Sequence, residues 1–223
     1  MAVRVNFHDE LVAAETALVA QAGLVGRQLD RVVEALVRRD AGAGAEVVGG
    51  DDAVDALYME TEERVLSLLA LQAPVAGDLR LVSAILHSNM HVERMGDLCV
   101  NVAKFVLDRH PYPPDEAMVT RLREMGARAG AMLEAAMAAF SQRSLTLAER
   151  LPEDDDALDR LNRGMLDDLR RYAGDERAFE WAANLVLVAR YLERFGDHCV
   201  DVGEQAAFLV TGVFREFTDA SRA

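Results

Sequence analysis

The segment Glu93-Arg-Met-Gly-Asp-Leu-Cys-Val-Asn-Val102 decides the fold, because it occurs twice in the chain. It returns one hundred residues later as Glu193-Arg-Phe-Gly-Asp-His-Cys-Val-Asp-Val202, with seven of the ten positions identical. A second pair of segments, Asp51-Asp-Ala-Val-Asp-Ala-Leu57 and Asp155-Asp-Ala-Leu-Asp-Arg-Leu161, is offset by 104 residues. Two matched segments at nearly the same offset indicate an internal duplication.

The sequence around both copies has the periodicity of α-helices. Apolar residues recur every seven positions from Leu11 to Val32 and again from Ile85 to Val106. This spacing aligns apolar side chains along one face of a helix. Aromatic residues make up only 6% of the chain and there are five prolines, which favours helices, because sheets draw on aromatic and β-branched residues. The sequence therefore predicts an all-α protein.

Prolines and short polar stretches divide each half into three helices. The Gly- and Ala-rich stretch 41–50 is expected to be a loop with at most one helical turn. The predicted helices cover residues 9–39, 51–71 and 76–108 in the first half and 115–144, 153–172 and 176–210 in the second. This pattern predicts two tandem, duplicated three-helix bundles, at residues 1–109 and 115–223, joined by a linker at 110–114.

Charge and hydropathy exclude several classes of protein. The net charge is −14, from 38 acidic and 24 basic residues, and a negative field repels the phosphates of nucleic acids. No apolar run approaches the length of a membrane span, and the N-terminal residues lack an apolar signal core. We therefore expect a cytoplasmic protein that neither binds nucleic acid nor inserts into membranes. Its two cysteines, Cys99 and Cys199, are expected to be buried core residues.

Acidic and amide side chains follow the repeated motif at intervals of four residues. Positions four apart share one face of a helix, and about 100° per residue directs this face away from the apolar stripe. The two rows are Glu93, Asp97 and Asn101 in the first half and Glu193, Asp197 and Asp201 in the second. The sequence thus predicts an acidic ladder that faces outward in each half.

Helical hairpins are expected to bring further acids beside these rows. Folding near Pro74 places Asp52 near Asp97 and Asp55 near Arg94, and folding near Gly174 places Asp155 beside Glu193. Carboxylate and amide oxygens suit cations such as Mg²⁺, Mn²⁺, iron or Zn²⁺. Each half is therefore a candidate metal site.

The residues alone leave a second interpretation open, in which the rows are ordinary solvated helix faces. Like charges four apart cost only about 0.2–0.5 kcal/mol, and Arg94 can pair with Asp97. His87 and His91 have the spacing of metal ligands but lie about 240–280° around the helix from Asp97, so we expect them to face solvent or a partner. His198 is a weak candidate as a neighbour of a metal ligand. A ferritin-like di-iron site is excluded, because neither motif has a histidine three residues after its glutamate.

The doubled Glu-Arg-x-Gly-Asp motif resembles the PhoU family of phosphate-signalling regulators. The hairpin turn Leu69-Ala-Leu-Gln-Ala-Pro-Val-Ala-Gly-Asp-Leu-Arg80 resembles it as well, and the similarity extends from about Asp9 to Gly212. The resemblance implies two similar three-helix bundles, often in a homodimer, with multinuclear metal clusters. It assigns these clusters to Glu93 and Asp97, extended by Asn101, and to Glu193 and Asp197, extended by Asp201, with Asp155 to Asp159 as the matching motif of the fifth helix.

The resemblance also implies a function. PhoU-like proteins are negative regulators of phosphate uptake and of the phosphate-starvation response, and act as adaptors between the phosphate ABC transporter and a sensor histidine kinase. The sequence contains no Gly-rich phosphate loop, nucleophile elbow or metalloprotease helix, so we expect no enzymatic activity. Two alternatives remain: a hydrolase of phosphate esters that uses paired metal ions, and a structural scaffold without metal.

Overall fold

The computed structural model describes residues 2–108 and 115–217, with side chains from residue 7 onward. These residues form helices and contain no β-strand. The first half consists of α1 (Ala2–Arg38), α2 (Ala41–Gln72) and α3 (Ala76–Leu107). The second half consists of α4 (Glu116–Gln142), the short α5 (Leu145–Ala148), α6 (Leu151–Leu169), the 3-10 turn η1 (Arg170–Tyr172) and α7 (Glu176–Thr211). The predicted linker 110–114 lies outside the described residues, so the domain boundaries stay a prediction.

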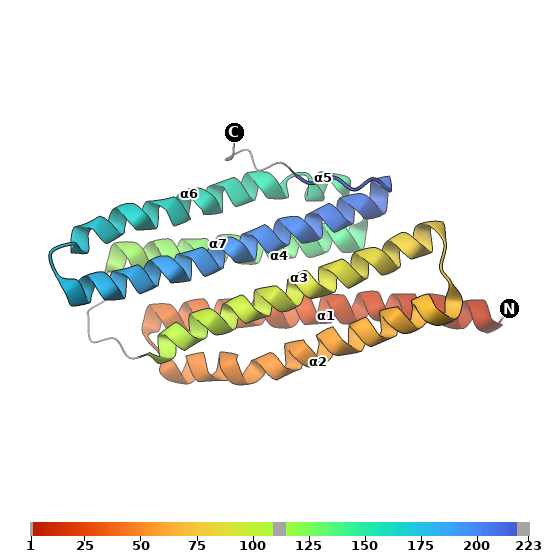
Figure 1. The fold of residues 1–223 in the computed structure, drawn as a ribbon, viewed down its shortest axis with the longest axis horizontal. Helices are drawn as coiled ribbons and strands as arrows, with labels where there is room; N and C mark the ends of the chain where they lie inside the picture. The colour runs from red at the N-terminus through yellow and green to blue at the C-terminus, as the bar shows by residue number, and fades with distance from the viewer. Residues whose placement is uncertain (1, 109–114, 218–223) are drawn as a thin grey trace.

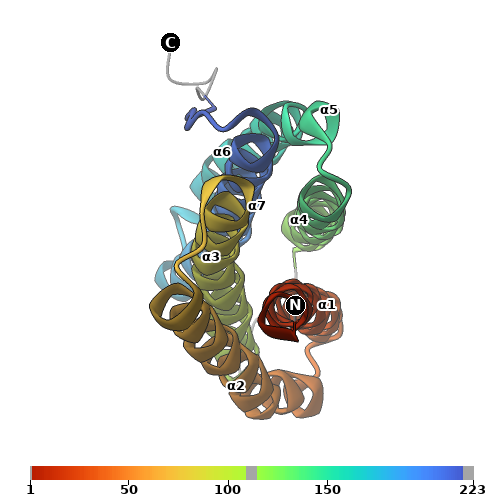
Figure 2. The same cartoon turned by 90° about the vertical axis from the view of Figure 1, so that its right-hand side faces the viewer.

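The long helices form two three-helix bundles that share one core. In the first bundle α1, α2 and α3 pack against one another, and in the second α4, α6 and α7 do so (Figure 1). The bundles meet where α3 packs on α7 and α1 on α4. Viewed along the helices, α2, α3, α7 and α6 form a curved layer, with α1 and α4 on its inner side (Figure 2). The predicted all-α, duplicated architecture is confirmed.

The apolar stripe of α1 lies in this shared core. Leu18 and Val25 are fully buried, and so is Leu122 of α4. Glu15 interrupts the stripe, but its carboxylate accepts hydrogen bonds of 2.8 and 2.7 Å from the guanidinium of Arg143 at the C-cap of α4. The polar exception in the stripe therefore joins the two bundles through a two-point ion pair.

The prediction of a loop at residues 41–50 is wrong, because α2 begins at Ala41. The side chain of Asp40 caps the helix by accepting a hydrogen bond of 3.1 Å from the backbone N–H of Ala43. Gly44 is buried, and a Cβ there would lie 3.4 Å from the carbonyl oxygen of Ala103 in α3. Each glycine costs a helix about 1 kcal/mol relative to alanine, but here close packing on α3 outweighs that local preference.

Both cysteines are buried, as expected, and they are free thiols. The Sγ atom of Cys199 lies 3.6 Å from the Sδ atom of Met95 across the junction of α7 and α3. Burial raises the pKa of each thiol, foremost by desolvation, which keeps both in the unreactive protonated form. Among the helices described, none is long and apolar enough to cross a bilayer.

The close approach of α1 and α4 at Gly126 can be tested by substitution. A Cβ at Gly126 would lie 2.5 Å from Cγ2 and 3.0 Å from Cγ1 of Val33, a stiff β-branched side chain. Overpacking of this kind costs about 1–3 kcal/mol, whereas alanine gains about 1 kcal/mol of helix propensity. We expect Gly126→Ala to lower the free energy of unfolding by about 1 kcal/mol, measured by urea denaturation.

Gly49 provides the matched control, because no atom lies within 4 Å of a Cβ at that position of α2. Gly49→Ala should therefore stabilise the protein by about 0.5–1 kcal/mol through helix propensity alone. Equal stabilisation by both substitutions would contradict the tight α1–α4 contact.

Candidate functional site

A cluster of carboxylates lies between α6 and α7, where Gly196 lets the two helices approach closely. A Cβ at Gly196 would lie 2.6 Å from Cδ2 of Leu158 and 2.8 Å from Oδ1 of Asp155. Only a residue without a side chain fits beside these α6 atoms. The glycine of the repeated motif therefore brings an acidic helix face against α7, next to Glu193 and Asp197.

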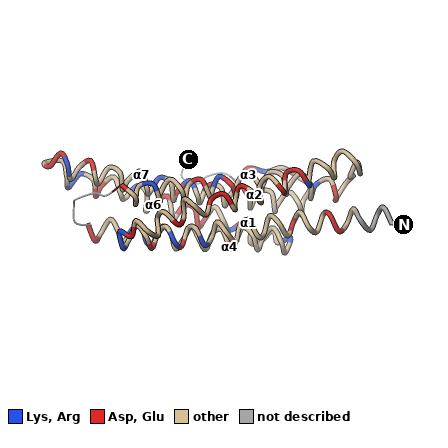
Figure 3. The backbone as a smooth tube through the Cα atoms, turned by 90° about the horizontal axis from the view of Figure 1, so that it is seen from below, with Lys and Arg blue, Asp and Glu red and all other residues tan. Residues whose placement is uncertain are grey.

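The first bundle repeats this arrangement between α2 and α3. A Cβ at Gly96 would lie 3.3 Å from Cγ1 of Val54 and 3.5 Å from Oδ1 of Asp51. The amide oxygen of Gln28, on α1, would be 3.6 Å from the same point. Gly96 thus admits one carboxylate and one buried amide beside the motif. Figure 3 shows acidic positions on all four helices of the layer, α2, α3, α6 and α7.

Glu193 is the most deeply buried carboxylate of the second cluster, with 7% of its side chain exposed. Burial raises its pKa to about 7, with further contributions from the like charges of Asp197 and Asp159, while Arg190 acts in the opposite direction. Arg190 contacts Oε1, Oε2 is buried, and a hydrogen bond with Asp159 adds to the raised pKa. Burial also raises the pKa of Asp197, with Asp159 adding to the effect and Arg190 opposing it.

In the first cluster burial and like charge also raise the pKa values of carboxyl groups, although the side chains are more exposed than that of Glu193. Burial raises the pKa of Glu93, and the charges of Asp97, Asp55 and Asp51 contribute. Burial likewise raises the pKa of Asp51, together with the charges of Asp55 and Asp97. Arg94 offsets part of this repulsion through ion pairs of 3.2 Å to Asp97 and 3.6 Å to Glu93. Four carboxylates therefore act on one another in the first half, and Glu193, Asp197 and Asp159 do so in the second.

Seven of the ten predicted ligands lie near one another in the two clusters, Asn101 lies beside the first, and Asp52 and Asp201 are exceptions. The residues brought together are Asp55, Glu93 and Asp97 in the first half and Asp155, Asp159, Glu193 and Asp197 in the second. Asp52 is exposed, and its neighbour Asp51 occupies the place beside Asp97. The repeat itself contained the signal for Asp51, because the offset of 104 residues pairs it with Asp155. Asn101, one turn beyond Asp97, is half-buried.

The expectation of an outward acidic row is wrong for Glu193 of the second half. Glu193 is buried, whereas Asp197 of the same row is exposed, as predicted. Helix α6 packs close to α7 at Gly196 and covers Glu193. A helical wheel of α7 alone places this residue outside the apolar stripe. Asp97, with 46% of its side chain exposed, keeps the predicted outward position.

Asp201, the second exception, turns to two histidines rather than to the carboxylates of α6. Its Oδ2 atom lies 3.1 Å from Nδ1 of His91 and 3.3 Å from Nδ1 of His198. Burial raises the pKa of Asp201, but hydrogen bonds from the two histidines outweigh this and hold it well below its usual range.

The prediction that His87 and His91 form a solvent- or partner-facing pair fails for one of them. The side chain of His91 is only 16% exposed, because α7 packs across this face of α3. His87 is exposed, as predicted, with Nδ1 placed 2.7 Å from the carbonyl oxygen of Ser83.

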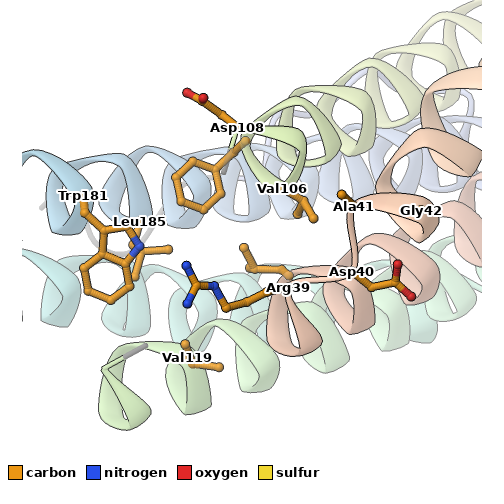
Figure 4. Close-up of a pocket in the computed structure, with 11 residues that line it drawn as sticks. Arg39, Asp40, Ala41, Gly42, Val106, Asp108, Val119, Trp181 and Leu185 are labelled. Atoms are coloured by element: carbon orange, nitrogen blue, oxygen red, sulfur yellow. The ribbon is translucent and has the colours of Figure 1, made fainter. Parts of the chain in front are cut away.

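A pocket of about 610 Å³ lies where the C-terminal ends of α1 and α3 approach the N-terminal parts of α2, α4 and α7. Its walls come from α1, α2, α3, α4 and α7, and the side chain of Arg39 extends into it toward Trp181 (Figure 4). Asp40 and Asp108 also line it, so charges of both signs are present. None of the predicted metal ligands contributes to this pocket, which separates it from the repeated acidic motif.

The raised pKa of Glu193 predicts a pH dependence of stability. In the unfolded chain this carboxyl ionises near its ordinary value of 4.5, whereas the folded protein holds the proton up to about pH 7. The folded state therefore binds more protons in this window, and the free energy of unfolding falls as pH rises from about 4.5 to about 7. In chelator-treated protein, Glu193→Gln should flatten this decline, by about 3 kcal/mol at most by pH 7.

Urea denaturation at successive pH values measures this effect. Asp154→Asn, which removes an exposed acid near the start of α6, controls for the loss of one negative charge. Parallel stability curves for the wild type and Glu193→Gln would contradict the assignment of a protonated, buried Glu193.

The chain matches known proteins over nearly its whole length. The family model described as "PhoU domain" matches twice, at residues 19–106 and 122–206. The phosphate-specific transport system accessory protein PhoU homolog 2 of Mycobacterium tuberculosis is 32% identical over 95% of this chain and 100% of its own. The PhoU homolog of Caulobacter vibrioides is 30% identical over 93% of this chain and 90% of its own.

A solved structure agrees with these sequence matches. The crystal structure of PhoU from Pseudomonas aeruginosa superposes with a TM-score of 0.86 at 30% identity, and the match covers 93% of this chain and all of that one. The two matched family domains coincide with the two bundles, and each contains one copy of the carboxylate cluster. The chain belongs to the PhoU family.

Proposed function

We propose that this protein is an accessory regulator of phosphate transport that restrains phosphate uptake and the phosphate-starvation response. The relatives are named as accessory proteins of the phosphate-specific transport system, and the matches span 90–100% of their length. In this proposal the protein is a cytoplasmic homodimer that couples the phosphate ABC transporter to a sensor histidine kinase. It acts as an adaptor and catalyses no reaction.

The second part of the proposal is that each carboxylate cluster binds divalent or transition metal ions, such as iron, zinc, manganese or magnesium. The observation that carries it is Glu193, a carboxyl with only 7% of its side chain exposed that lies against the like charges of Asp159 and Asp197. A buried carboxylate among like charges is costly unless a cation compensates it. The donors are oxygens, which suit these ions.

Metal binding in these clusters requires the carboxylates to turn toward a common point. Within the described part of the chain, neither cluster has three carboxylates whose oxygen atoms all lie within 4.8 Å of one another. Rotation about χ angles is inexpensive for side chains as exposed as Asp97. A bound ion supplies positive charge to a protein whose net charge is −14, and so changes the surface that a partner meets.

Elemental analysis of the purified full-length protein tests the metal sites. We expect about one or more transition-metal ions per chain in the wild type, in line with the multi-carboxylate donor set. The combined variant Glu93→Gln, Asp97→Asn, Glu193→Gln and Asp197→Asn should lose the ions of the two clusters, because amides are weaker ligands than carboxylates.

A matched variant neutralises the same number of exposed acids elsewhere: Glu63→Gln, Asp78→Asn, Asp154→Asn and Asp167→Asn. It should keep the metal content of the wild type. If the cluster variant folds and retains the wild-type content, the clusters are not the metal sites. Helical circular dichroism establishes folding in each case.

Gene deletion tests the regulatory role. Deletion should derepress phosphate-starvation genes in medium rich in phosphate, and the wild-type gene on a plasmid should restore repression. We expect the cluster variant to restore it poorly and the matched variant to restore it fully. Unchanged expression after deletion would contradict the proposal, and metal-dependent hydrolysis of phosphate esters by the wild type would favour the hydrolase instead.

A further inference from the structure

We propose that His91, His198 and Asp201 form a binding site for one divalent transition-metal ion at the junction of the two bundles. The site is separate from the carboxylate clusters and does not depend on the proposed function. His91 comes from α3 and the other two residues from α7. An ion bound there joins the two repeats directly.

The geometry of the three donor atoms fits a small metal ion. Nδ1 of His91 lies 3.1 Å from Nδ1 of His198 and 3.1 Å from Oδ2 of Asp201, and the third separation is 3.3 Å. Zinc bonds of about 2.0–2.1 Å in a tetrahedral arrangement require ligand atoms roughly 3.3 Å apart. An ion placed roughly 1 Å above the centre of this triangle would be within bonding distance of all three atoms. The donors therefore need almost no movement to bind it.

Hydrogen bonds account for only part of this arrangement. A ring nitrogen carries at most one proton. If both Nδ1 atoms donate to Asp201, no proton lies between the two rings, which are 3.1 Å apart at these nitrogens. If one ring donates to the other, the second ring has no proton for Asp201. In either case at least one of the three close contacts lacks a hydrogen bond, whereas a single metal ion can bind all three atoms.

The surroundings favour a cation and give it access. The carboxylates of Asp197 and Glu204 lie within electrostatic range of Asp201, so the neighbourhood of the site is negative. The two histidine side chains are 16% and 18% exposed, and that of Asp201 is 39% exposed. Solvent therefore reaches the side of the carboxylate, where a water molecule can complete the coordination. Two imidazoles and one carboxylate are ligands typical of zinc and other first-row transition metals.

The repeat contains this ligand set only once. The offset of one hundred residues relates His91 to Tyr191, His198 to Leu98 and Asp201 to Asn101. The three equivalent positions, which like the ligands are divided between α3 and α7, therefore carry no such ligand set. His91→Tyr and Asp201→Asn introduce the residues that the fold already contains at the equivalent positions, 191 and 101. These substitutions are therefore suitable for a test.

The experiment is a Co²⁺ titration of chelator-treated, full-length protein, followed by the visible absorption of nitrogen- and oxygen-ligated cobalt. We expect one ion in the wild type to show the spectrum of nitrogen-ligated cobalt, which differs from that of cobalt bound by the all-oxygen clusters. His91→Tyr should weaken binding by more than the 10–100-fold that loss of an outer-shell partner causes, because it removes a direct ligand. Tyr191→Phe, at the equivalent position of the other repeat, is the control and should leave the signal unchanged.

The same titration in the cluster variant separates this inference from the proposed function. We expect that variant to keep the Co²⁺ signal of the histidine site while it loses the ions of the carboxylate clusters. If His91→Tyr does not fold, Asp201→Asn provides the same test with a nearly isosteric change. Wild-type Co²⁺ affinity and spectrum in a folded His91→Tyr or Asp201→Asn protein would overturn the inference, whatever the metal content of the clusters.

Discussion

The close approach of α6 to α7 at Gly196, and of α2 to α3 at Gly96, is the contact on which the candidate site depends. Each glycine leaves room for an aspartate oxygen and an aliphatic side chain from the neighbouring helix. The carboxylates of two helices are thereby held close together and partly buried. Because burial and like charge both disfavour the ionised form, the packing itself raises the pKa values of Glu93 and Glu193.

The fold could be predicted almost completely from the sequence, because helices, heptad spacing and duplication are local signals. The stripe of α1 and the two copies of the motif specify which faces are buried, and the bundles follow from them. The stretch 41–50 could not be predicted in this way. Its glycines disfavour a helix locally, and the close packing of Gly44 on Ala103 and Val106 of α3, distant in sequence, adds to the Asp40 cap in stabilising one.

Most of the candidate site could be predicted from the sequence. Two errors were the choice of Asp52 in place of Asp51 and the failure to see that α7 covers His91. The hairpin geometry identified the right pairs of helices, but it selected Asp52 where Asp51 faces Asp97, since a shift of one residue rotates a helical side chain by about 100°. The role of His91 could not be predicted, because a helical wheel of α3 contains no information about which helix of the other bundle covers it. Contacts within a bundle could thus be predicted from the sequence, whereas contacts between the bundles could not.

The pairing of equivalent helices, α3 with α7 and α1 with α4, is the arrangement of a symmetric dimer whose two subunits have been joined into one chain. In a dimer of identical subunits every substitution at the interface appears twice, at two symmetry-related places. Once the repeats are fused, each side of the interface is encoded separately and can change alone. Tyr191, Leu98 and Asn101 at one of the two equivalent places and His91, His198 and Asp201 at the other illustrate that independence. Two repeats within one chain therefore have a freedom that a symmetric dimer lacks, because one of the two places can acquire a new chemistry while the other continues to hold the bundles together.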